Sequence, residues 1–132
     1  MLNEPILRLL RPEQLAALVC WQFGIPAQYQ AMMGDDFKAF SSRTLSHVMQ
    51  TYLQIEVPSA TQSRTLVAVG QKETIYAKRA ARTLSHSIPG AKGVTIPGYG
   101  HVWNLEAPDL FVETVRAWVT DKPLPNRLMP LQ

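Results

Sequence analysis

Apolar residues in the first half of the chain recur at helical spacing between prolines and glycines. Leu15, Leu18 and Val19 fall on one face of a helix that is expected over residues 12–24, since proline suits the first position of a helix and glycine ends one. A second, short helix is expected over residues 26–34, which proline and glycine again bound. The first part of the chain is therefore predicted to be helical.

A third and longer helix is expected over residues 37–55. Asp35 and Asp36 favour a helix N-terminus just before it, because carboxylates accept hydrogen bonds from the free N–H groups of a first turn and oppose its partial positive charge. Apolar residues then recur near a 3.6-residue period; they include Phe37, Phe40, Val48, Tyr52 and Ile55. Residues 57–63 contain a proline and small polar side chains, so the helical part is expected to end there.

The pattern changes after Ser63. Residues 65–69 form a continuous apolar, partly β-branched run that Gly70 ends, which is typical of a strand buried on both faces. Small and apolar residues at helical spacing follow it, namely Ala77, Ala80, Ala81 and Leu84. Residues 93–96 then predict a second strand and residues 108–119 a last helix, so the second half is predicted to be strand, helix, strand, helix.

Two strands joined by a helix of this length form a right-handed parallel unit, so their C-terminal ends are expected to lie side by side. Ligand-binding and catalytic groups of open α/β sheets collect at that edge. Glu73 follows the first strand and His101 follows the second. We therefore expect these two side chains to lie close together.

A carboxylate and an imidazole at such an edge suit proton transfer. Gly98 and Gly100 let the loop before His101 turn sharply. Glu73 would accept a hydrogen bond from one ring nitrogen and leave the other nitrogen to act as a general base. On spacing alone the alternative is that His101 is a turn residue and Glu73 an acid that caps the following helix.

The second half also resembles a known family. Four blocks carry the resemblance: LVAVGQKE at residues 66–73, IPGA at 88–91, IPGYGH at 96–101 and EAPDLF at 106–111. Their order and spacing over residues 64–119 are similar to the C-terminal part of α/β-hydrolase fold enzymes. The resemblance implies that Glu73 is the acid and His101 the base of a catalytic triad. Glu73 departs from the aspartate more usual in the family.

Tyr99 and Trp103 flank the histidine. The resemblance makes them candidates for contact with a substrate, and the alternative is that both are packing aromatics.

The expected fold class is α/β. It is a partial α/β-hydrolase fold, in which a cap-like helical segment precedes strand-helix-strand-helix with parallel strands. Residues 1–62 would form a helical cap or lid, residues 63–121 the C-terminal part of the core, and residues 122–132 a tail. Apolar cap residues would line a pocket or form a simple helical core; they are Trp21, Phe23, Tyr29, Met32, Met33, Phe37 and Phe40.

The nucleophile of the family is absent from the sequence. None of the seven serines (Ser41, Ser42, Ser46, Ser59, Ser63, Ser85 and Ser87) lies in a Gly-x-Ser-x-Gly elbow. The resemblance therefore implies a hydrolase of ester, amide or carbon–carbon bonds that lacks the nucleophile-bearing N-terminal half and is inactive alone. The alternatives are a non-catalytic binding or interaction module and a truncated chain with no function of its own.

Composition narrows the class of protein. The 132 residues are 46% hydrophobic and 17% charged, which favours one compact globular unit. The net charge of +3 comes from scattered basic residues, so no nucleic-acid partner is expected. No apolar window is long enough for a membrane span, and the protein is expected to be cytoplasmic. The single cysteine, Cys20, excludes an internal disulfide and is expected to be a small buried residue of a helix.

The sequence also carries expectations about ligands and partners. No histidine spacing suits a metal, so neither a metal nor another cofactor is expected, and a small-molecule substrate is implied only for a complete enzyme. The strand at residues 65–69 would have an open edge, which a homodimer or a complementing N-terminal half would cover. The tail is expected to be loosely held unless its apolar side chains (Leu128, Met129 and Leu131) dock.

Overall fold

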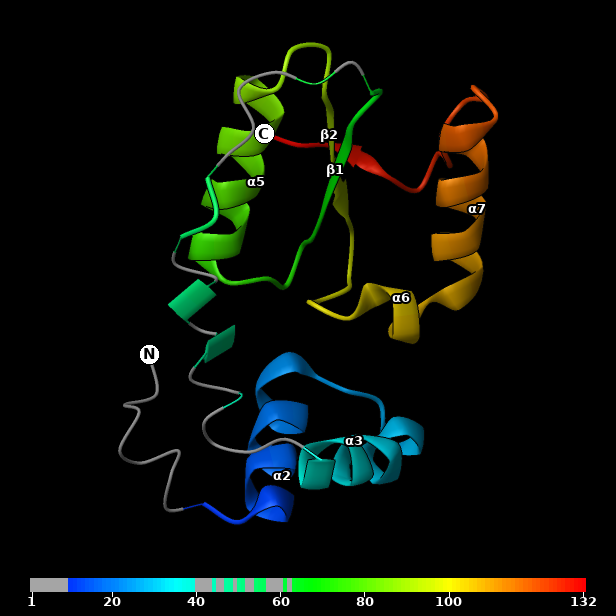
Figure 1. The fold of residues 1–132 in the computed structure, drawn as a ribbon. Coiled ribbons are helices and arrows are strands. Elements are labelled where there is room, and N and C mark those ends of the chain that lie inside the picture. Colours follow the sequence, from blue (N-terminus) through cyan, green and yellow to red (C-terminus); the bar gives the residue numbers. More distant parts are fainter. Residues whose placement is uncertain are drawn as a thin grey trace. The chain divides into compact units, whose positions relative to one another are not determined.

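The computed structural model of the chain describes residues 10–39, 44, 47–48, 50–51, 54–56, 61 and 63–132. The chain divides into two compact units, Met1–Glu56 and Val57–Gln132. The described residues contain five helices and a three-stranded sheet (Figure 1), so the expected α/β class is confirmed. Among the helices described, none is long and apolar enough to cross a membrane.

Two packed helices, α2 (Pro12–Phe23) and α3 (Ala27–Ala39), make up the first unit as far as it is described. Helix α2 begins and ends where its sequence predicts. Proline occupies its first turn, and Gly24 follows it in the left-handed conformation with φ of 65°. Cys20 is buried in this helix, as expected of a small apolar residue.

Helix α3 runs through Gly34, and the predicted boundary between a short helix over 26–34 and a longer one over 37–55 is wrong. Asp35 does not cap a new helix; its carboxylate lies 2.9 Å from the ammonium group of Lys38 one turn later and raises the pKa of that lysine. An interior glycine costs a helix only about 1 kcal/mol, so packing on α2 and such i,i+3 pairs suffice to continue it. Beyond Ala39 only residues 44, 47–48 and 50–51 are described as helical, and the rest of the expected segment lies outside the described residues.

The second unit is built on two parallel strands. Strand β1 (Leu66–Gly70) pairs with β2 (Lys92–Ile96) from Leu66 opposite Lys92 to Gly70 opposite Ile96, and α5 (Ile75–Ser87) connects them, as predicted. A short helix, α6 (Trp103–Glu106), precedes α7 (Pro108–Val119). Figure 1 shows α5 and α7 on opposite sides of the sheet, which gives a layer of helix on each face.

Each face of the sheet has its own apolar cluster. Val67 and Val69 of β1 pack with Ala81 of α5, whereas Val94 and Ile96 of β2 pack with Leu110 of α7. The expectation that β1 is buried on both faces is wrong, because Ala68 is exposed. Helix α5 covers one face of β1, but α7 does not cover Ala68 on the other face.

The tail is docked on the sheet and adds an antiparallel strand to it. The expectation that the sheet contains only parallel strands is therefore wrong. Strand β3 (Met129–Pro130) pairs with β2 in the antiparallel sense, and the N–H of Leu131 donates to the carbonyl of Gly93 at 3.1 Å. Leu128 and Leu131 pack against the two apolar clusters, and the guanidinium of Arg82 donates to the carbonyl of Gln132. Burial of these leucines and pairing of an otherwise open strand edge explain why the tail is held.

We expect Gly34→Ala to stabilise the first unit by about 0.5–1 kcal/mol, because alanine loses less backbone entropy in a helix. A Cβ at this position meets no atom within 4 Å. The matched control is Gly24→Ala, which also meets no atom within 4 Å but sits at φ of 65° and is expected to cost about 1 kcal/mol. Urea unfolding of the full chain, followed by circular dichroism, measures both. A lower midpoint for Gly34→Ala would contradict a continuous helix α3.

Candidate active site

Two loops leave the sheet side by side at the C-terminal ends of the parallel strands. The loop at residues 71–74 connects β1 to α5, and the loop at residues 97–102 connects β2 to α6. The last residues of the two strands, Gly70 and Ile96, are directly paired in the sheet. The parallel register alone therefore starts both loops from neighbouring positions.

Backbone hydrogen bonds hold the two loops together. The N–H of Gln71 donates to the carbonyl of Ile96 at 2.9 Å, and the N–H of Lys72 donates to the carbonyl of Tyr99 at 2.9 Å. The side-chain oxygen of Gln71 accepts from the N–H of Gly98 at 2.8 Å, and Gly98 has the positive φ of 80° that favours glycine. The pairing of the strands thus continues beyond the sheet into the loops.

Gly70 permits the close approach of the loops. A Cβ built on this residue would lie 2.3 Å from the carbonyl oxygen of Gly100 and 2.6 Å from that of Tyr99. Both atoms are backbone, so a side chain would have to displace the loop itself. The requirement for glycine here is steric and depends on a segment that lies thirty residues away in the sequence.

Glu106 holds the second loop from its other end. The N–H of Gly100, next to the histidine, donates to the Oε2 atom of Glu106 at 2.9 Å in a partly buried position. Glu106 is the last residue of the one-turn helix α6, which folds the chain back toward the loop. In the sequence this glutamate stands only in the block that opens the last helix, and no local pattern signals the positioning roles of Glu106 and Gln71.

Glu73 and His101 meet where the two loops join. The Nδ1 atom of His101 is hydrogen-bonded to the Oε1 atom of Glu73. An ionised carboxylate only accepts hydrogen bonds, so Nδ1 carries the proton and the lone pair of the neutral ring resides on Nε2. The Glu73 side chain is 10% exposed and that of His101 is 53% exposed, so the acid is enclosed and the imidazole reaches the surface. The expected proximity of the two residues is confirmed, and their catalytic role stays a prediction.

The same carboxylate also supports the residue that caps α5. The Oε2 atom of Glu73 accepts from the N–H of Thr74 at 3.1 Å, and the hydroxyl of Thr74 in turn accepts from the N–H of Ala77 at 3.2 Å. The two interpretations that the sequence leaves open for Glu73 are therefore compatible. Anchoring one oxygen at the start of a helix, where negative charge is stabilised, orients the other oxygen toward the imidazole.

Tyr99 and Trp103 pack beside the histidine loop. Both lie against the cluster of Val94, Ile96 and Leu110, and the Trp103 ring meets Phe111 edge to face at a centroid distance of 5.0 Å. These contacts account for both residues as packing aromatics. Their contact with a substrate stays a prediction.

The described residues supply a proton acceptor but no hydroxyl or thiol in a nucleophile elbow. The hydroxyl of Ser85 donates to the carbonyl of Arg82 within α5, and Cys20 is buried in the other unit. Serines 41, 42, 46 and 59 lie outside the described residues. Across the part of the chain that is described, no group of three or more His, Cys, Asp and Glu side chains is placed to hold a metal.

Comparison of the chain with protein-family models, with curated proteins and with solved structures found no match.

We expect Gly70→Ala to destabilise the second unit by about 1–3 kcal/mol, because the added Cβ would overlap the backbone of residues 99–100. Gly90→Ala is the control in the same unit; its Cβ meets no atom within 4 Å, so only the strain of its φ of 73° is expected, about 1 kcal/mol. Chemical denaturation of both variants measures the difference. Equal losses of stability would contradict a close approach of the loop to Gly70.

We expect Glu73→Ala to release the tautomer of His101. With the carboxylate present, the neutral ring holds its proton on Nδ1; without it, the proton is expected to shift largely to Nε2, the site that free imidazole side chains favour. Nitrogen-15 chemical shifts of the ring at a pH where it is neutral report the two forms. His101→Ala identifies the signals of His101. His86 is the internal control, because its ring is bonded through Nδ1 to the carbonyl of Arg82 and not to an acid. An unchanged His101 spectrum would show that Glu73 does not set the tautomer.

Proposed function

We propose that this chain belongs to the α/β-hydrolase superfamily and carries the acid and base of its catalytic triad, acting on an ester, amide or carbon–carbon bond. The observation that carries the proposal is the hydrogen bond between Glu73 and His101 at the adjoining C-terminal ends of two parallel strands. The sequence blocks around these residues support it by resemblance. An α/β fold and the spacing of the sequence blocks are compatible with many activities. The hydrogen-bonded pair of Glu73 and His101 is therefore the specific support for a hydrolase.

In the proposed mechanism His101 acts as general base. Its Nε2 atom takes a proton from an attacking hydroxyl and later returns it to the leaving group, and water then releases the second product. Glu73 holds Nδ1–H and stabilises the imidazolium that forms between the two transfers. Gly70, Gln71 and Glu106 are positioning residues, since they fix the loop that carries the imidazole.

The hydroxyl is proposed to come from a separate nucleophile-bearing segment. The 132 residues contain no Gly-x-Ser-x-Gly elbow, which the superfamily uses to present its serine and one of the N–H groups of the oxyanion hole. The chain alone is therefore proposed to be catalytically silent. Its first unit is proposed to be a cap, for which the exposed apolar residues Trp21 and Met32 offer a surface; they are 81% and 54% exposed.

A second candidate is a non-catalytic binding or interaction module. The observation that favours it is a group of exposed apolar side chains on α7, from Phe111 at 37% to Val119 at 69% exposed. Clusters of this kind on a folded domain mark contact surfaces. Both candidates predict that the isolated chain is catalytically inactive. They differ in whether activity appears when a nucleophile-bearing segment is added.

We expect the pure chain to hydrolyse p-nitrophenyl acetate no faster than free imidazole at the same concentration, because the general base has no activated hydroxyl. His101→Ala should remove at most this slow, non-saturable background. Saturable turnover by the chain that His101→Ala abolishes would show that the nucleophile lies within these residues.

Adding a polypeptide with a Gly-x-Ser-x-Gly elbow, such as one encoded upstream, tests the proposal itself. Activity is expected to rise by several orders of magnitude and to fall by about 10³ or more in His101→Ala. His86→Ala is the matched control and should keep that activity, since it removes a histidine outside the site. Complemented activity that survives His101→Ala would refute the assignment of the base, and tight binding without activity would favour the interaction module.

A further inference from the structure

Helix α5 carries cations and no acid. It contains Lys78, Arg79 and Arg82, and the sequence from residue 74 to residue 105 has no aspartate or glutamate. The exposed face of a helix typically carries charges of both signs, which pair one turn apart. Lys78 and Arg79 form no ion pair with any described residue. The helix therefore presents positive charge that the described part of the chain does not neutralise.

The acids of the second unit lie elsewhere. Glu73 and Glu106 hold the histidine loop, and Asp121 pairs with the arginine that precedes β1. The other two acids, Asp109 and Glu113, belong to α7. Figure 1 shows α5 and α7 on opposite sides of the sheet. The charge of this unit is thus polarised, and its positive side is α5.

The cations of α5 lie along one flank of the helix. Lys78, Arg79 and Arg82 occupy positions i, i+1 and i+4, and Ile75, which is 74% exposed, precedes them by one turn on the same flank. The guanidinium of Arg82 donates to the carbonyl of Gln132, so this flank faces the docked tail. Because the sheet order is β1-β2-β3, the flank faces away from the unpaired edge of β1. A segment that covers that edge leaves the flank accessible.

The tail adds an exposed apolar side chain beside this flank. Met129 of β3 lies directly opposite Thr95 of β2 and is 46% exposed. Opposite residues of an antiparallel pair point to the same face of a sheet. Thr95 alternates along β2 with the two residues that pack on the α7 side, Val94 and Ile96. Met129 is therefore on the face of the sheet that carries α5.

The register places Met129 level with the cations. A Cβ on Gly93 would lie 3.1 Å from the Cβ of Ser85, so these two residues are level with each other. Thr95 is two residues farther along β2, and α5 runs antiparallel to this strand, so Met129 is about one helical turn nearer the start of α5 than Ser85. That is the middle of the helix, where Arg82 lies. We call the following residues the cationic surface: Ile75, Lys78, Arg79, Arg82 and Met129.

We propose that the cationic surface binds an acidic polypeptide segment that also carries apolar side chains. Carboxylates of the segment pair with Lys78, Arg79 and Arg82, and its apolar side chains cover Ile75 and Met129. Each exposed ion pair contributes little, so affinity depends on several pairs formed together and on the apolar contacts between them. Charge complementarity of this kind speeds association and selects the partner. The inference does not rest on the proposed function.

The shape and size of the surface favour a polypeptide as the occupant. Met129 lies at the level of the sheet, whereas Arg79 lies on a helix one layer above it, so a flat bilayer that meets the helix does not reach Met129. Proteins that hold a nucleic-acid duplex make about 6–10 phosphate contacts, more than the three cations of this surface supply. A polypeptide segment follows the step between helix and sheet.

The edge of β3 indicates that this segment does not bind as a further strand. The N–H of Leu131 donates to Gly93, so the neighbouring residue, Pro130, turns its backbone away from β2 toward the outer edge. Proline has no N–H and so interrupts the row of donors that an added strand would need. The segment is therefore held by side-chain contacts with the cationic surface.

Fluorescence anisotropy of a labelled peptide in the presence of the full chain tests the proposal. The probe is a short peptide in which leucine recurs at every third or fourth position among glutamates, at about 0.15 M salt, where attraction between distant charges is screened. The wild type is expected to bind it in the micromolar range. Lys78→Glu combined with Arg79→Glu is expected to raise the dissociation constant about tenfold, and Met129→Ser severalfold.

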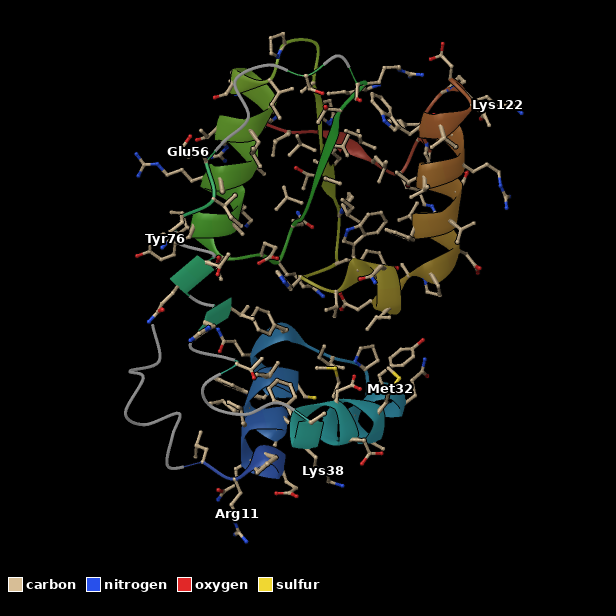
Figure 2. All side chains as sticks on the ribbon, viewed as in Figure 1. Arg11, Met32, Lys38, Glu56, Tyr76 and Lys122 are labelled. Atoms are coloured by element: carbon tan, nitrogen blue, oxygen red, sulfur yellow. The ribbon has the colours of Figure 1, made fainter. Side chains whose placement is uncertain are left out.

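The matched control reverses two charges on the other side of the sheet. Arg116→Glu combined with Lys122→Glu changes the net charge equally, and Figure 2 shows Lys122 at the end of α7. This control is expected to change the dissociation constant by less than about twofold, because its charges lie far from the peptide. Circular dichroism establishes that each variant is folded. Amide chemical shifts of the wild type locate the peptide without any substitution: signals of α5 and β3 should move, and those of α7 should not.

Several results would overturn the proposal. They are a wild type that does not bind the peptide, an equal loss of affinity in both charge-reversed variants, shifts confined to α7, and equal binding of a peptide with glutamine in place of every glutamate. Binding of phosphatidylserine vesicles or duplex DNA in place of the peptide, lost on reversal of Lys78 and Arg79, would assign the surface to another occupant and would also overturn it.

Discussion

The parallel pairing of β1 with β2 is the constraint on which the candidate site depends. It starts two loops from adjacent residues, Gly70 and Ile96, and backbone hydrogen bonds extend the pairing past the ends of the strands. The absence of a side chain at Gly70 then lets the second loop pack directly on the first. The sheet thus sets the positions of the two loops through main-chain contacts, and the side chains of Gln71 and Glu106 add hydrogen bonds that hold the loop before His101. Catalytic geometry needs that kind of support, because small displacements of a general base are costly.

Glu73 links the stability of the fold to the chemistry of the site. Its carboxylate accepts from the N–H of Thr74, the N-cap residue of α5, and bonds to the imidazole, so one side chain supports a helix terminus and orients His101. Glu73 is the residue before the N-cap of α5, and its side chain, one methylene longer than that of aspartate, reaches both Thr74 and His101. The acid is enclosed and the imidazole is exposed, so Glu73 fixes the orientation of a ring that is accessible from the surface.

The open side of the second unit explains why a further polypeptide is expected. Helix α5 and the docked tail bury one face and one edge of the sheet, whereas β1 keeps an unpaired edge within the described residues and Ala68 stays exposed. Unpaired strand edges and contiguous apolar side chains are both costly in water.

The sequence by itself determined the elements whose signals are local: the ends of α2, the strand, helix, strand, helix order of the second half, the parallel direction of β1 and β2, and the meeting of Glu73 with His101. Only the tertiary structure decided the continuation of α3 through Gly34, the antiparallel docking of β3, the exposure of Ala68, and the support of the histidine loop by Gln71 and Glu106. Periodicity, proline and glycine report the conformation of neighbouring residues. The other features depend on which distant backbone groups and apolar surfaces come into contact, and that is settled by packing over the whole unit.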